Sequence, residues 1–190
     1  MSSDVSPGQD AAVVEFNALR AEMIARQNSQ QGLLSIQLTA TGALFSLALS
    51  GAGRSAVLLV LPLVTYMLAG RHVSHSYACL SIAAYIRTRL SDRVSGGLGW
   101  EEWLRTHRSS PRRRRFFNPL FITFPGISLL ALLGSVPYLG SLPGSVTAAM
   151  LWSAWLAGIA LTALSARLVW QTRSDSFLWI GPTSGPADDL

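Results

Sequence analysis

The chain has no lysine, a single cysteine, and charged side chains on only 13% of its 190 residues. Soluble domains usually carry charge on about a quarter of their residues, so this shortage, with 49% apolar residues, is typical of a bilayer protein. The lone Cys79 excludes an intramolecular disulfide and a zinc site built from cysteines alone. The net charge of +5 comes from arginine, whose positions must be judged relative to lipid before nucleic acid is considered.

Four apolar segments approach the length of a membrane span, since a helix needs roughly 20 residues to cross about 30 Å of hydrocarbon. They are residues 33–50, 55–70, 116–133 and 145–169. Pro119 is expected in the first turn of the third span, and Pro125 is expected to kink it by removing a backbone donor. The sequence therefore predicts an all-α integral membrane protein with four transmembrane helices in two hairpins. The hairpin tips are expected at residues 51–54 and 134–144.

The arginines predict the orientation of these spans. Residues 71–115 hold ten of the fifteen arginines, whereas the two hairpin tips hold only Arg54. By the positive-inside rule, this segment and both termini face the cytoplasm. The predicted order is a cytoplasmic amphipathic helix (1–31), a first transmembrane hairpin (32–70), a cytoplasmic helix with an arginine-rich part (71–115), a second transmembrane hairpin (116–169) and a cytoplasmic tail (170–190).

A run of arginines stands directly before the third span. It consists of Arg112, Arg113, Arg114 and Arg115. Such a run can bind nucleic-acid phosphates, but at this position we expect it to pair with anionic lipid headgroups. Membrane lipids are therefore predicted partners, and nucleic acid is not.

The polar segments beside the first hairpin are periodic. In residues 10–31, apolar side chains recur at four, three and four residues, at Ala12, Phe16, Leu19 and Met23. Residues 71–94 carry two such stripes, Val73, Tyr77, Leu80 and Ala84, and Cys79, Ala83, Ile86 and Leu90. These spacings predict helices continuous with the spans. Because a short loop makes the spans antiparallel neighbours, the two extensions should form a cytoplasmic helical stalk.

Catalytic signatures are missing. The four segments contain no Asp, Glu, Lys or His, which argues against a proton-coupled transporter and an intramembrane metallohydrolase. His72, His75 and Cys79 share a helix face and are a weak candidate for a metal site, although packing at a wet interface is the favoured interpretation. Nucleophile elbows, phosphate loops and well-spaced carboxylate pairs are also missing. We therefore predict no catalytic residue, cofactor or metal.

Two of the predicted spans carry stripes of small or weakly polar residues. These are Ser35, Thr39, Gly42 and Ser46 in the first span and Ala154, Gly158, Thr162 and Ala166 in the fourth. Small residues let helices approach closely in lipid, and weakly polar ones can line a narrow path in an oligomer. Both interpretations favour helix association and a homo-oligomer.

The first half of the chain resembles a known family. The residues concerned are the stretch Glu15-Phe-Asn-Ala-Leu-Arg20-Ala-Glu22, the glutamines Gln27, Gln30 and Gln31 before a two-span hairpin, and a long helix ending in Leu98-Gly99-Trp100-Glu101. This pattern resembles uncharacterised bacterial membrane proteins, and over residues 10–105 it is similar to the SLATT-type two-span effectors of nucleotide-triggered defence systems. The resemblance implies a hairpin that oligomerises and breaches a bacterial cell membrane on a cytoplasmic signal. The chain differs in adding a second hairpin, and we expect no nucleotide-sensing domain within it.

These observations predict a non-enzymatic multi-pass protein of the bacterial plasma membrane that forms a homo-oligomeric pore or perturbs the bilayer, with the first span lining any opening. One alternative is a membrane scaffold or accessory subunit whose stalk recruits a cytoplasmic protein partner. The other is an interfacial enzyme acting on a lipid or prenyl substrate, with His72 and His75 as acid-base groups.

Overall fold

The computed structural model describes residues 7–51, 53–94, 99, 119–142, 144 and 146–178. All regular structure in these residues is helical. Four stretches are long and apolar enough to cross a membrane: Asp10–Leu49, Arg54–Arg93, Pro119–Gly140 and Val146–Thr172. The predicted all-α fold with four candidate spans is therefore confirmed. The arginine run at 112–115 lies outside the described residues.

The first helix, α1, runs without a break over Pro7–Leu49. Its only internal helix-weakening residue between the polar and apolar parts is Gly32, and one glycine costs only about 1 kcal/mol relative to alanine. The helix ends in a tight turn in which Gly53 takes a φ of 86°, a left-handed conformation that favours glycine. Arg54 donates from its guanidinium to the Ser50 hydroxyl at 2.9 Å and closes this turn.

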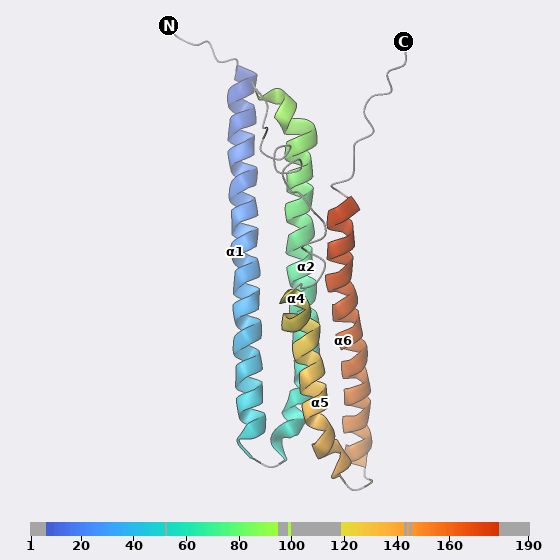
Figure 1. Cartoon of the computed structure of the whole chain (residues 1–190). Coiled ribbons are helices and arrows are strands. Elements are labelled where there is room, and N and C mark those ends of the chain that lie inside the picture. Colours follow the sequence, from blue (N-terminus) through green and yellow to red (C-terminus); the bar gives the residue numbers. More distant parts are fainter. Residues whose placement is uncertain are drawn as a thin grey trace, which may run out of the picture.

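The chain then returns alongside α1 as one long helical stretch (Figure 1). It begins with a 3-10 helix, η1 (Arg54–Val60), and continues as α2 (Leu61–Tyr85), a π-helical turn, η2 (Ile86–Leu90), and a short 3-10 helix, η3 (Ser91–Arg93). Pro62 lies in the first turn of α2, where a missing backbone N–H leaves no hydrogen bond unmade.

Within the described residues, the second hairpin consists of α4 (Pro119–Phe121), the π-helical η4 (Ile122–Gly126), α5 (Ile127–Gly140) and α6 (Val146–Leu178). Pro119 lies in the first turn, as predicted, whereas the predicted start at residue 116 lies outside the described residues. The distortion expected at Pro125 is the π-helical η4. A π turn accommodates this proline, which has no backbone N–H to donate. The predicted end of the third span near residue 133 is wrong, because α5 continues through Pro137 to Gly140. Leu139 is buried there, and its packing outweighs the local cost of proline.

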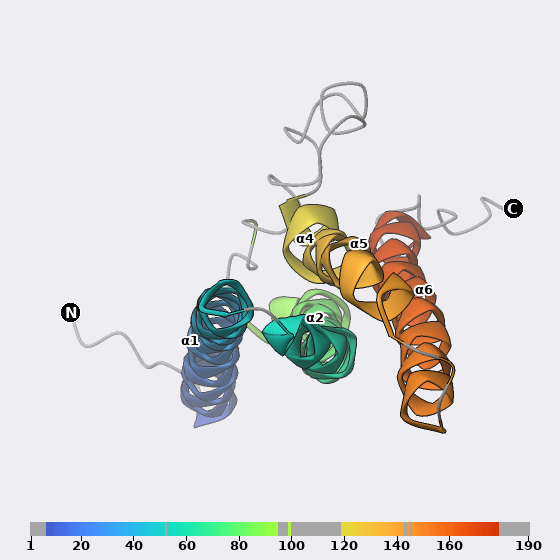
Figure 2. The same ribbon diagram turned by 90° about the horizontal axis from the view of Figure 1, so that it is seen from below.

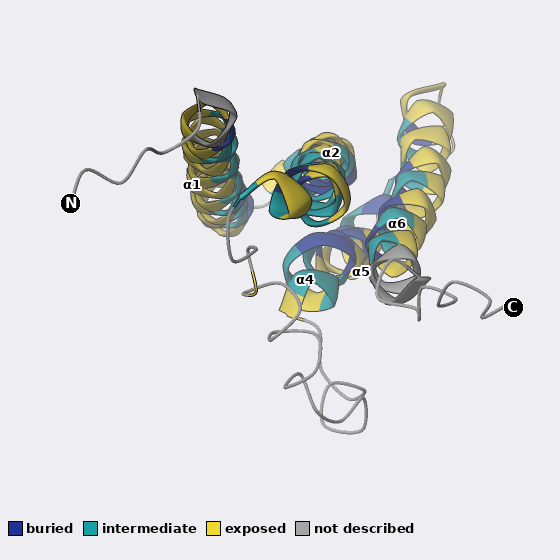
Figure 3. Cartoon of the chain, turned by 90° about the horizontal axis from the view of Figure 1, so that it is seen from above, coloured by how far each residue is buried: buried dark blue, intermediate teal, exposed yellow. Residues whose placement is uncertain are grey.

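The centre of the bundle is α2, with α1 on one side and α5 and α6 on the other (Figure 2). Three buried clusters follow one another along it. They are the stalk cluster (Ala12, Ile86 and Leu90), the middle cluster (Ala69, Phe124 and Val169, with Leu34 against it) and the loop cluster (Ala48, Leu58, Leu61 and Ala131). The helix α1 buries only the face turned toward α2, and its opposite face is exposed (Figure 3).

Candidate functional site

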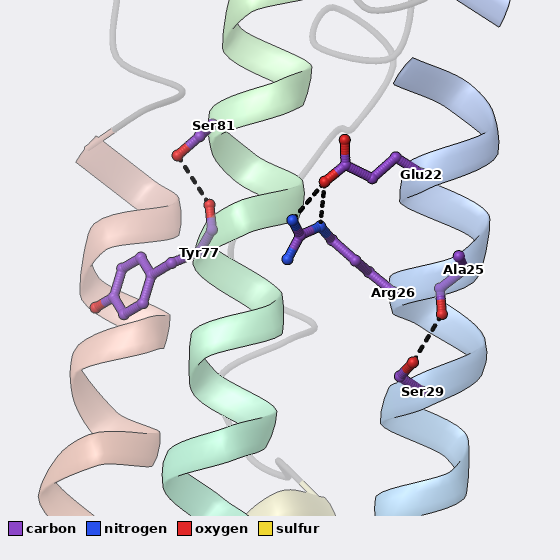
Figure 4. A network of polar contacts seen from close by, with 6 residues as sticks. All are labelled: Glu22, Ala25, Arg26, Ser29, Tyr77 and Ser81. Atoms are coloured by element: carbon purple, nitrogen blue, oxygen red, sulfur yellow. Dashed lines mark hydrogen bonds and ion pairs between the residues drawn. The ribbon is translucent and has the colours of Figure 1, made fainter. Parts of the chain in front are cut away.

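The two helices of the predicted stalk contact each other through an apolar seam and through polar contacts. All four periodic residues of the N-terminal segment pack in or against the stalk cluster, as their spacing predicts: Ala12, Phe16, Leu19 and Met23. The second predicted stripe of α2 and η2 contributes Ile86 and Leu90 to this seam, whereas Tyr77 of the first points away from α1 (Figure 4). The Tyr85 hydroxyl donates to Glu15 Oε1 at 2.6 Å. Gln30 Nε2 donates to Ser76 Oγ at 2.7 Å.

The candidate metal ligands face different neighbours. His72 is buried with its ring 5.7 Å from that of Phe124, in the second hairpin. The charges of Glu22 and Arg26 on α1 act on the Cys79 thiol. These two residues form an ion pair with each other (Figure 4). Burial raises the pKa of the Cys79 thiol, which disfavours the thiolate that a metal needs. Among the described residues, no group of three His, Cys, Asp or Glu side chains is placed to hold a metal ion, so His75 does not complete such a set.

The predicted small-residue stripe of the first span lies on the exposed face of α1. Ser35, Thr39, Gly42 and Ser46 are all exposed. A Cβ atom added at Gly42 would meet no atom within 4 Å. Ser35 donates its hydroxyl to the Gln31 carbonyl of the same helix at 3.2 Å, so it needs no partner in a neighbouring helix. This face is therefore open to lipid or to another helix.

The stripe continues far beyond the predicted span. Steps of three and four residues connect eleven exposed positions, here called the α1 stripe. They are Ala11, Val14, Ala18, Ala21, Ala25, Asn28, Gly32, Ser35, Thr39, Gly42 and Ser46. The first seven were missed because they precede the apolar segment at residues 33–50, although the same spacing could have identified them. Such a period close to 3.5 residues is the pattern of left-handed helix pairing.

The α1 stripe is opposite the seam with α2. At 100° per residue, Thr39 is roughly 180° from the middle of Gln37 and Thr41. In the stalk, Ala18 is roughly 130° from the middle of the seam residues Ala12, Phe16, Leu19 and Met23. Large exposed side chains border the stripe, among them Ile36 on one side and Leu38 on the other. In the apolar part of α1, the stripe is thus a shallow track of small residues between two apolar ridges.

The predicted stripe of the fourth span is partly used within the chain itself. A Cβ atom at Gly158 would lie 2.8 Å from Leu132 Cδ2 and 3.2 Å from Pro62 Cγ, so α6 approaches α2 and α5 closely at this glycine. Thr162 is half-buried and donates its hydroxyl to the Gly158 carbonyl at 2.8 Å, whereas Ala154 is exposed. At Gly158, therefore, the small residue serves packing.

Each of the four long helices also contributes one buried polar residue to a polar layer: Gln37, Thr65, Ser128 and Ser165, all 0% exposed. Each lies three or four residues from a residue of the middle cluster, on the side of the hairpin loops. The pairs are Gln37 with Leu34, Thr65 with Ala69, Ser128 with Phe124, and Ser165 with Val169. Gln37 Nε2 donates to Thr65 Oγ1 at 2.9 Å and joins α1 to α2. Among the described residues, Gln37 Oε1 and Ser128 Oγ have no hydrogen-bond partner. The sequence did not reveal this layer because its four residues lie on four different helices, so no spacing along one helix connects them.

Comparisons with known proteins give no match. No protein-family model fits the chain, and no curated protein or solved structure is significantly similar to it.

Proposed function

We propose that this chain is a non-enzymatic multi-pass protein of a bacterial plasma membrane, and that copies of it associate through the α1 stripe into a homo-oligomer that opens or perturbs the bilayer. The observation that carries the proposal is the α1 stripe itself. It follows a helix of 43 residues on the face opposite the seam with α2, and every position of it is exposed.

The physics of helix association in lipid supports this use of the stripe. Lipid tails are as apolar as leucine, so helices associate through close packing and not through the hydrophobic effect. Small residues such as Gly42 and Ser46 let two backbones approach, and the ridges at Ile36 and Leu38 can fit against the partner helix. A second copy of α1 carries the same track and the same ridges, so the surface suits self-association.

The hydroxyl groups of the stripe support the proposal that the oligomer contains a polar path across the bilayer. Ser35, Thr39 and Ser46 are exposed and line one side of the apolar part of α1. Hydroxyls that converge from several copies would replace part of the hydration of a passing ion or polar solute. The stalk would face the cytoplasm, and the arginine run at 112–115 would pair with anionic headgroups.

A flux experiment tests this function. The full chain is inserted into liposomes that enclose a fluorescent dye, and leakage is compared for the unchanged protein, Thr39→Arg and Ala157→Arg. Both variants place one charge on an exposed helix face at membrane depth, but only the first places it in the α1 stripe. We expect leakage from the unchanged protein and Ala157→Arg, and altered leakage from Thr39→Arg. Impermeable vesicles with correctly inserted protein would contradict the proposal.

One observation favours the scaffold alternative. Val13 and Ile24, which lie outside the α1 stripe, are 45% and 51% exposed in the part of α1 assigned to the cytoplasm, where apolar side chains contact water. A cytoplasmic protein partner could cover them. In that case a specific protein should co-purify with the chain and be lost in a Val13→Glu, Ile24→Glu double variant, with no leakage in liposomes.

A further inference from the structure

The second hairpin contains a groove at the level of the proposed inner leaflet. Its volume is about 420 Å³, within the range of small-molecule sites, about 300–1,000 Å³. Phe121, Gly126 and Leu129 line one wall, and Ile159, Ala163 and Ala166 of α6 line the other. Thr162 is the only residue with a polar side chain among those that line the groove in the described part of the chain, so its walls are suited to hydrocarbon.

The groove results from side chains that are missing and from the π turn at Pro125. Gly126 is the last residue of that turn, and a Cβ atom there would lie 3.0 Å from the Phe121 carbonyl oxygen. On α6, Ala163 and Ala166 provide only methyl groups where longer side chains would fill the space. Leu129 and Ile159 remain 52% and 41% exposed, so the groove is open to the surroundings of the bundle.

The end of the groove nearest the C-terminus of α6 combines an aromatic pair with a positive charge. The rings of Phe121 and Trp170 meet edge to face, with centroids 6.2 Å apart. Arg167 follows Ala163 by four residues, so it continues the same side of α6 one turn beyond the groove, and it is exposed. None of the residues that line the groove is acidic.

We infer that this groove binds one acyl chain of an anionic phospholipid of the inner leaflet, whose phosphate pairs with Arg167. The groove lies between helices that flank the middle cluster, and in the sequence the arginine-rich segment precedes α4, which contributes Phe121 to the groove. Arg167 is therefore at the depth of the cytoplasmic headgroups, where it attracts an anionic headgroup more strongly than a zwitterionic one. Trp170, beside it, is a residue type enriched at this interface.

This site depends on the proposed membrane position but not on the α1 stripe, because the groove lies on the opposite side of α2. Failure of the pore experiment would leave it intact.

Native mass spectrometry of the full chain in detergent tests the inference, with phosphatidylglycerol and phosphatidylcholine of identical acyl chains added in equal amounts. We expect the unchanged protein to retain one phosphatidylglycerol with about a fivefold preference, the effect of one arginine near a membrane surface. Arg167→Gln should retain lipid but lose the preference. Ala163→Phe should fill the groove and lose the bound lipid. Two controls, Arg54→Gln at the other end of the bundle and Ala160→Phe on an exposed face outside the groove, should behave as the unchanged protein.

Other results would overturn the inference. Equal retention of the two lipids by the unchanged protein would remove the role of charge. Unchanged retention by Ala163→Phe would remove the groove. Loss of the preference only when all four arginines at 112–115 are replaced by glutamine would assign the lipid to that run. Arg167 is exposed, so its variant should fold normally and give an answer even if Ala163→Phe does not fold.

Discussion

The two helices of the first hairpin differ in how their surfaces are used. In its most apolar window, the stretch containing α2 has 39% of its residues buried, whereas α1 has 11%. The helix α2 packs against α1 on one side and against α5 and α6 on the other, so little of it is free. The helix α1 is held along a single seam. The comparison indicates that α2 maintains the fold of one copy, while α1 has a long face available for other contacts.

The largest effect is expected where the two helices meet. Leu90 is 0% exposed in the stalk cluster, so Leu90→Ala should lower the local free energy of unfolding by about 2–5 kcal/mol through the cavity it leaves. The matched change Ile24→Ala, on the exposed part of α1, should stay within about 0.5 kcal/mol. Hydrogen exchange of the amides at residues 10–30 measures both. Equal exchange in the two variants would show that the seam does not hold the stalk.

Gly158 lies where α6 packs against other helices, whereas Gly42 lies on the exposed face of α1. Gly158→Leu forces a side chain into Leu132 and Pro62, and should lower the free energy of unfolding by about 1–3 kcal/mol. Gly42→Leu meets no atom of its own chain within 4 Å, so the stability of a single copy should be unchanged or slightly higher. Thermal unfolding in detergent at low protein concentration gives the comparison. A large loss in Gly42→Leu would mean that α1 packs differently from this structure.

A smaller effect is expected in the polar layer that joins the two helices. Thr65→Val removes the acceptor of the Gln37 amide and should cost about 0.6–1.7 kcal/mol, the range of interhelical hydrogen bonds in membranes. Combining it with Gln37→Leu removes the unpaired Oε1 as well, so the double variant should regain most of the lost stability. A double-mutant cycle of unfolding free energies measures this coupling. Additive effects would show that the hydrogen bond contributes nothing.

The smallest effect concerns an exposed contact of the stalk. The hydrogen bond to Glu15 raises the pKa of Tyr85, so the neutral phenol is the form that the folded stalk favours. Because the folded pKa is above the unfolded one, this contribution is present at neutral pH and is lost as the pH rises through the raised pKa. Tyr85→Phe should therefore make the start of α1 exchange slightly faster at neutral pH, with no difference at strongly alkaline pH. An equal difference at both pH values would contradict the assignment.

The sequence was sufficient to predict features that repeat along one helix. The spacing of Ala12, Phe16 and Leu19 located the seam on α1, because an apolar stripe must be buried wherever its partner lies. Contacts between helices could not be predicted in the same way. The hydrogen bond between Gln37 and Thr65 depends on the register of α1 against α2, which is fixed by packing along the whole hairpin.

The end of the third span was predicted wrongly, at residue 133 instead of Gly140. The second hairpin tip was predicted at residues 134–144, a segment in which Gly134 and Pro137 are helix-weakening residues. The buried Leu132 and Leu139 hold this part of α5 against its neighbours, and burial of such side chains outweighs a local preference. The outcome of that competition depends on residues far away in the chain.

The most direct test of the account is disulfide cross-linking between copies in the membrane. The single native cysteine is removed as Cys79→Ser, and one cysteine is introduced at Thr39, Gly42, Ala157 or Ala48. Thr39 and Gly42 belong to the α1 stripe, Ala157 is exposed on α6, and Ala48 is buried within its own copy. On oxidation, we expect linked dimers for the cysteines at 39 and 42 and far fewer at 48 and 157. Only monomers at all four positions, or equal linking at all four, would contradict it.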